Sequence, residues 1–172
     1  MNFFQKLKFK KEIKKHINRP LDIEEILSRE RNENVVVDTY EFFMRRSGWV
    51  IDGRFSDTVK TFLLCVLYDG EVAGGGISQF LLESSGKHAH QTADALHAVG
   101  AFESEALLRK SFSLVPHSAV PEDDETRNEI LLNNGKADDL LEELDENAYT
   151  QDIQSLCLKY LSDRKEHFLS FK

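Results

Sequence analysis

Residues 74–86 read Gly-Gly-Gly-Ile-Ser-Gln-Phe-Leu-Leu-Glu-Ser-Ser-Gly. They predict a short helix that begins after a glycine triplet and ends at a helix stop signal. The glycine triplet permits a tight turn or a close backbone approach that a side chain would block. Ile77, Phe80 and Leu81 follow the i, i+3, i+4 spacing of one apolar helical face. The Ser-Ser-Gly that follows is a stop signal, and we expect Gly86 to end the helix in the left-handed conformation.

The same stretch is part of a longer pattern, made of Glu71, Val72, Gly75, Gly76, Gln79, Phe80, Ser84, Ser85 and Gly86. This pattern resembles the signature of a bacterial family of DNA-mimic proteins. Members of that family typically carry Asn where Gly74 and Glu83 stand, and Phe where Ile77 stands. We interpret the signature residues as structural, so the signature predicts the fold more directly than it predicts mimicry.

Further along the chain, other short blocks keep the order expected of this family. They are Ala95–Ala101, Phe112 with Val115-Pro116, Arg127, Leu144-Asp145 and Tyr149. The resemblance covers about residues 55–162 and implies an all-α fold. It also implies a binding role, because the studied member is a dimer whose acidic surface resembles duplex DNA and captures a transcription factor. The first 50 residues lie mostly outside the resemblance.

The charge of the chain is divided unevenly. The 172 residues carry a net charge of −8, but residues 1–19 hold seven Lys or Arg against one Glu, a net +6. The remainder holds 15 basic and 29 acidic residues, a net −14. An acidic body is unsuited to bind nucleic acid, because phosphate binding needs cations, and it is suited to a basic partner.

The two cysteines indicate a reducing compartment. Cys65 and Cys157 are far apart in the sequence and each lies in an apolar run, so we expect buried thiols in preference to a single disulfide. No apolar run approaches the length of a membrane span, and no secretory signal is evident. We therefore expect a cytoplasmic protein.

Hydrophobic periodicity predicts an all-α fold of about eight or nine helices in a single compact domain, residues 20–172, preceded by a basic N-terminal helix, residues 1–19. Asn-Gly hairpin signals between strands are absent. The expected helices cover residues 3–18, 22–46, 56–69, 77–82, 89–99, 102–115, 121–132, 138–146 and 153–161.

The basic N-terminal segment interleaves Phe3, Leu7, Phe9, Ile13 and Ile17 with six lysines. Three interpretations stay open: a solvated helix that covers the core with its apolar edge, contact with an anionic membrane, or docking on an acidic protein face. We expect membrane contact to be the least favoured. Docking on the acidic face of its own or a sister chain would let this segment compete with partners.

Motifs for catalysis, cofactors or metals are weak. The glycine triplet lacks the Gly-Lys-Ser/Thr of a phosphate-binding loop, because His88 follows Gly86-Lys87. His90 and His97 share a helical face, but no third metal ligand joins them. Ser84 and Ser85 lack the surroundings of a nucleophile. The sequence thus predicts no enzyme, no cofactor and no metal site.

Residues 122–146 hold eleven acidic residues against Arg127 and Lys136. On a helix, the carboxylates of residues 138–146 form two adjacent tracks opposite Leu140, Leu141 and Leu144, with successive carboxylates about 6 Å apart. Such tracks can imitate closely spaced phosphates, or they can simply be a solvated face. The predicted acidic face comprises Asp123, Asp124, Glu129, Asp138, Asp139, Glu142, Glu143 and Glu146.

Three functional hypotheses follow from charge and resemblance. The first is a non-catalytic binding module that engages a basic protein, such as a transcription factor or another nucleic-acid-binding protein, with a homodimer left open. The second is an immunity or antitoxin-like protein that blocks a toxin enzyme with its acidic surface. The third is a small enzyme, which requires a pocket with convergent polar groups.

Overall fold

The computed structural model describes residues 20–133, 137–149 and 151–171, and all regular elements in these ranges are helical. The predicted all-α class is confirmed, and nine α-helices in the described ranges agree with the expected number. None of these helices is both long and apolar enough to cross a membrane. The predicted helix over residues 3–18 lies outside the described residues.

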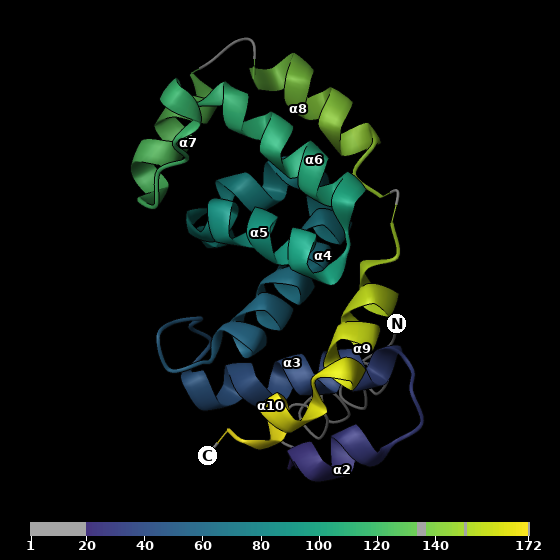
Figure 1. The fold of residues 1–172 in the computed structure, drawn as a ribbon. Helices are drawn as coiled ribbons and strands as arrows, with labels where there is room; N and C mark the ends of the chain where they lie inside the picture. Colours follow the sequence, from purple (N-terminus) through teal and green to yellow (C-terminus); the bar gives the residue numbers. More distant parts are fainter. Residues whose placement is uncertain (1–19, 134–136, 150, 172) are drawn as a thin grey trace, which may run out of the picture.

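In chain order the elements are α2 (Ile23–Ser28), α3 (Glu33–Ser47), α4 (Asp57–Leu82), η1 (Ser84–His88), α5 (Ala89–Val99), α6 (Phe102–Ser111), η2 (Phe112–Leu114), η3 (Pro116–Ser118), α7 (Asp124–Leu132), α8 (Ala137–Glu146), α9 (Ile153–Asp163) and α10 (Lys165–Leu169). The η elements are short 3-10 helices. α4 is central, since it contacts α3, α5, α7, α8, α9 and α10. Figure 1 shows α2, α3, α9 and α10 grouped at one end of the molecule and α5–α8 at the other.

An aromatic cluster closes the end of the core that contains the C-terminus. The ring of Phe43 in α3 packs edge-to-face against Phe55, Phe168 and Phe171, with centroid distances of 5.9, 6.0 and 5.0 Å. Phe62 of α4 contacts Phe168 in the same way at 5.3 Å. The last helix of the chain is therefore tied to α3 and α4 through buried aromatic area.

Several helix ends are set by groups that lie close by in the sequence. Asp22 caps α2 by accepting a hydrogen bond from the Glu25 amide at 2.8 Å, and Ser56 caps α4. Gly48 and Gly100 end α3 and α5 in the left-handed conformation, with φ of 68° and 88°. These devices need only groups within a few residues of the helix end.

The prediction of one continuous helix over residues 22–46 is wrong, because the chain forms two helices, α2 and α3, with a break between them. Asn32 adopts an extended conformation and its side chain accepts a hydrogen bond from the Asn34 amide, which starts a new helix. Arg29 ties the two helices together through ion pairs with Glu25 of α2 and Asp38 of α3.

The prediction that Asp69-Gly70 ends a helix is also wrong. α4 continues through Gly70 because Tyr68 and Val72, on either side of it, are buried and packed in the core. The interruption comes instead at Gly75 and Gly76, whose backbone angles are not helical. The predicted helices over residues 56–69 and 77–82 are therefore two halves of one kinked helix.

Two further predictions about helix ends are corrected by the structure. Gly86 is not left-handed; it lies buried in η1, and α4 ends at Glu83 in an extended conformation. Pro121 does not occupy the first turn of a helix, since α7 begins at Asp124. Asp123 caps α7 because its carboxylate accepts a hydrogen bond from the Thr126 amide at 2.8 Å.

Candidate protein-binding face

α8 presents the predicted carboxylate tracks to solvent. Leu141 and Leu144 are buried against the rest of the domain, and Leu140 is half-buried. The intervening positions turn outward because a helix repeats every 3.6 residues. The exposed acidic side chains of α8 are Asp139, Glu142, Glu143 and Glu146. We call these four residues the α8 carboxylates. The helix includes Asp138, whose side chain lies outside the described part of the chain.

A hollow adjoins the α8 carboxylates. It has a volume of about 430 Å³ and is lined by Ser78, Leu82, Leu131, Leu132, Leu141, Glu142, Asp145 and Glu146. We call it the leucine groove, because four leucines from α4, α7 and α8 make up its apolar part. Leu132 is 68% exposed, whereas Leu131 beside it is buried. An apolar hollow with a carboxylate rim suits a ligand that is both apolar and cationic.

The α8 carboxylates differ in their surroundings. Lys110 of α6 lies 2.8 Å from the Glu143 carboxylate, so part of that charge is compensated within the domain. Glu142 and Glu146 stand one turn apart at the rim of the leucine groove. A cation that approaches the groove would therefore meet the carboxylates of Glu142 and Glu146, whereas the carboxylate of Glu143 is already paired with Lys110.

The predicted α7 members of the acidic face have structural roles as well. Asp123 caps α7, and its hydrogen bonds with Thr126 lower the pKa of the Asp123 carboxyl. Asp124 pairs with Arg127 at 2.7 Å. Glu129 is exposed on the same helix. Both aspartates lie at the start of α7, away from the connection to α8. The structure thus places Glu142 and Glu146 at the groove and Asp139 and Glu143 on the same exposed face of α8, whereas Asp123 and Asp124 lie apart from them.

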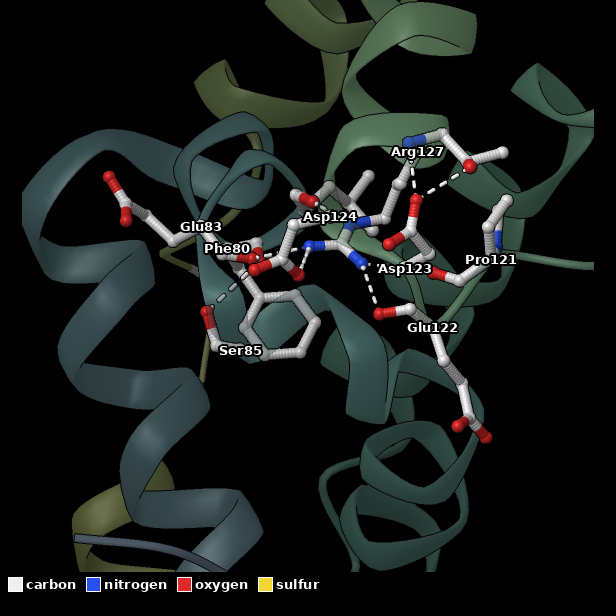
Figure 2. A network of polar contacts seen from close by, with 10 residues as sticks. Phe80, Glu83, Ser85, Pro121, Glu122, Asp123, Asp124 and Arg127 are labelled. Atoms are coloured by element: carbon white, nitrogen blue, oxygen red, sulfur yellow. Dashed lines mark hydrogen bonds and ion pairs between the residues drawn. The ribbon is translucent and has the colours of Figure 1, made fainter.

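Arg127 joins the end of α4 to the segment that precedes α7, and its side chain is fully buried (Figure 2). Its guanidinium donates to the carbonyl oxygens of Leu81 at 2.5 Å and Glu83 at 2.7 Å. It also donates to the carbonyl oxygens of Pro121 at 2.9 Å and Glu122 at 3.3 Å. The cation therefore satisfies acceptors at the C-terminal end of α4, where the helix dipole is negative.

Gly86 gives Arg127 the room that it needs. A Cβ on Gly86 would lie 2.6 Å from the guanidinium Nε and 2.4 Å from the Leu81 carbonyl oxygen. Ser85 supports the same turn, because its buried hydroxyl donates to the Phe80 carbonyl oxygen at 3.1 Å. The signature positions Ser85 and Gly86 are thus explained by close packing around a buried cation.

The kink in α4 depends on α8. Gly76 has φ +77° and ψ −171°, and a Cβ there would lie 2.3 Å from the Asp145 carboxyl group. Asp145 accepts hydrogen bonds from the backbone amide of Ser78 at 3.1 Å and from its hydroxyl at 2.5 Å. It thereby caps the second half of α4 from a different helix. This bond anchors α8 and fixes the orientation of its carboxylates.

Gln79 crosses the kink on its other side. Its amide donates to the Glu71 carboxylate at 2.9 Å, and a Cβ on Gly75 would lie 2.4 Å from its Oε1 atom. Phe80 is buried and packs edge-to-face on Tyr68 at 5.2 Å. These contacts give the signature residues Glu71, Gly75, Gln79 and Phe80 structural roles.

The other residues considered for chemistry occupy structural positions. His90 accepts a hydrogen bond from the Val120 amide at 3.2 Å, and His97 lies 2.7 Å from Glu105. Within the described ranges no three His, Cys, Asp or Glu side chains are grouped to hold a metal ion. Cys65 and Cys157 are free and buried, as predicted, and burial raises the pKa of the Cys65 thiol.

A second hollow bears on the enzyme hypothesis. It is lined in part by Tyr40, Glu71, Lys87 and His88 and has a volume of about 190 Å³. Burial raises the pKa of Tyr40 to about 12 and lowers that of His88. Small-molecule sites span about 300–1,000 Å³. The hollow is smaller than this range, and its Glu71 carboxylate already accepts a hydrogen bond from Gln79.

Comparison with known proteins identifies the family of this chain. The profile of a family described as DMP19-like protein matches residues 53–164. The chain belongs to the DMP19-like family. The match to the DMP19-like family begins just before α4 and ends just after α9, so it includes the kink, Arg127 and α8. No curated protein and no solved structure matches the chain.

Sequence reasoning missed the roles of two residues in this DMP19-like domain. The sequence marks Arg127 as part of the family pattern and as a cation in the acidic run, and its place just after four consecutive acidic residues is a signal for an ion pair. The sequence marks Asp145 as part of the family pattern, but the structure makes it the cap of the second half of α4. Its partner Ser78 is 67 residues away, so local pattern could not reveal the bond.

Proposed function

We propose that this DMP19-like protein is a non-catalytic binding module that captures a basic, DNA-binding protein through its acidic face. The observation that carries the proposal is the exposure of the α8 carboxylates on a helix anchored by Leu141, Leu144 and Asp145. A rigidly held row of charges needs little reorganisation when a partner binds.

The spacing of these charges supports mimicry of a phosphate backbone. Asp139 and Glu143 are one turn apart, as are Glu142 and Glu146, so each pair of carboxylates is separated by about 6 Å. Residues 20–172 carry a net charge of −14, which steers basic partners toward the domain and repels nucleic acid. Membership of the DMP19-like family supports the same role, because the resemblance of the chain is to DNA mimics.

The test begins with a pull-down from native lysate, washed at low and at high salt, followed by mass spectrometry of the bound proteins. The proposal expects a basic DNA-binding protein that salt releases and that duplex DNA displaces. A bound toxin-like enzyme would support the immunity hypothesis instead. If neither salt condition retains a specific partner, the proposal is contradicted.

A charge-reversal variant then localises the contact. Changing Asp139, Glu142 and Glu143 to Lys should weaken binding of the purified partner by tenfold or more, in line with about 1.4 kcal/mol per tenfold change. The matched control reverses three exposed carboxylates on other elements, namely Glu24, Glu103 and Glu166. Both variants change the net charge equally. Equal weakening in both, or none in the first, would show that the α8 carboxylates do not form the contact.

A further inference from the structure

The leucine groove leaves apolar surface uncovered at the end of the domain formed by α7 and α8. Leu132 has the largest exposed fraction among the large hydrophobic side chains of the described residues. It stands at the end of α7, beside the buried Leu131 and Leu141. A single leucine on a surface is ordinary, but a leucine that lines a 430 Å³ hollow with three others offers a place for apolar anchors.

The rim of the groove is acidic on its α8 side. Glu142 and Glu146 are exposed there, whereas Asp145 is engaged with Ser78. A helix that places large apolar residues in the groove would run alongside these carboxylates, so its flanking residues should be cationic. The ligand that fits is a basic amphipathic helix.

The sequence predicts one such helix in this chain. Residues 1–19 carry a net charge of +6 and interleave large apolar residues with six lysines. Among the described residues, a third hollow of about 130 Å³ lies next to α2 and α9. Its lining includes Arg31 and Lys165 but no Asp or Glu. Charge therefore disfavours that hollow and favours the leucine groove.

We propose that residues 1–19 of one copy occupy the leucine groove of a second copy. The described chain begins at Pro20 beside α2, at the end of the molecule opposite α7 and α8 (Figure 1). A helix of nineteen residues would span about 28 Å. If the whole segment lies along the groove as a helix, no length remains to bridge the molecule from α2, whereas the segment of a neighbouring copy can enter from outside.

A reciprocal exchange of these segments would form a closed, two-fold pair. In that pair the basic segments cover the rim of the acidic face and compete with any basic partner. The exchange itself does not depend on the function proposed above, because it requires only two copies of this chain.

Photo-cross-linking of the full-length chain tests the exchange. Leu132 is replaced by p-benzoylphenylalanine, which its exposure should allow, and ¹⁴N-labelled and ¹⁵N-labelled chains are mixed before irradiation. Mass spectrometry should find cross-links from position 132 to residues 1–19, in mixed-isotope pairs. The control carries the same photoreactive group in place of Phe102, an exposed side chain on α6.

Changing Glu142 and Glu146 to Lys in the chain that carries the photoreactive group at position 132 should abolish most of these cross-links. In the chain that keeps both glutamates, 0.5 M salt should reduce the cross-links. The inference is overturned if position 132 cross-links only to other segments or to nothing, if the pairs are never of mixed isotope, or if position 102 captures residues 1–19 equally well. A full-length chain that sediments as a monomer at the labelling concentration would also overturn it.

Discussion

Replacement of Arg127 by methionine removes the cation that links α4 to α7 while keeping similar side-chain bulk. The guanidinium is fully buried and donates to four backbone carbonyl oxygens and to Asp124. Asp124 is about half exposed, so water can replace the lost pair there. The four carbonyl groups cannot all be hydrated without opening the packing around Gly86.

The magnitude follows from these contacts. Hydrogen bonds to a charged group contribute about 1.5–3 kcal/mol each, but four do not add, because partial opening admits water to several acceptors at once. Each buried carbonyl oxygen left without a donor costs about 1–3 kcal/mol, so two that stay unhydrated already cost several kcal/mol. We therefore expect Arg127→Met to lower the free energy of unfolding by about 3–5 kcal/mol. At an m-value of about 2 kcal/mol/M, the urea midpoint falls by about 1.5–2.5 M.

The assay is equilibrium urea unfolding followed by far-UV circular dichroism, with Arg109→Met as the matched control. Arg109 also contacts two carboxylates, Glu105 and Asp94, but its side chain is 42% exposed. That surface network should contribute about 1 kcal/mol or less. Arg127→Lys keeps the charge with fewer donors and provides a measurable intermediate if Arg127→Met does not fold. A loss below 1 kcal/mol for Arg127→Met, or equal losses for both arginines, would refute the structural role assigned to Arg127.

Three further outcomes are expected. Gly76→Ala should lower the free energy of unfolding by about 2–4 kcal/mol, because the backbone angles of Gly76 are essentially restricted to glycine and a Cβ would collide with Asp145. Gly70→Ala, at an exposed position in the middle of α4, should raise the free energy of unfolding by about 0.5–1 kcal/mol. Thermal unfolding compares the two variants, and a Gly76→Ala variant as stable as the parent would count against the kink geometry. Burial raises the pKa of the Asp69 carboxyl above its ordinary 3.8, so the contribution of Asp69 to the free energy of unfolding is full below pH 3.8 and is lost as the pH rises through the folded-state pKa. Asp69→Asn should therefore be more stable than the parent at pH 7, and this difference in stability should close below pH 4. A difference that does not change with pH would contradict the prediction. Deletion of residues 1–19 should tighten binding of a basic partner to the remaining domain by removing a competing segment, and unchanged or weaker binding in a titration would argue against self-competition.

Local sequence was sufficient wherever the deciding group lies within a few residues. The caps at Asp22 and Ser56 and the left-handed ends at Gly48 and Gly100 follow from side-chain or backbone hydrogen bonds inside one turn. The outward direction of the α8 carboxylates follows from helical periodicity in the same way, since leucines at positions 141 and 144 fix which face is buried.

The leucine groove could not be predicted from any one segment. Its walls come from α4, α7 and α8, and the exposure of Leu132 depends on how α7 packs against α4 and α8. The candidate site therefore combines a charged helix face that the sequence indicates with an apolar hollow that only packing creates.

By itself, the sequence determined the all-α class, the positions of most helix ends, the acidic body and the basic first 19 residues, because periodicity, capping and charge are local or additive properties. Tertiary structure alone decided that α4 passes through Gly70 and bends at Gly76, and that Gly86 makes room for a cation. The path through Gly70 depends on the burial of Tyr68 and Val72 in the core. The bend at Gly76 and the place of Gly86 depend on bonds between residues 67 and 46 positions apart, from Ser78 to Asp145 and from Arg127 to Leu81. Such bonds form only when the intervening helices have packed, since their free energy must offset the entropy of closing long loops.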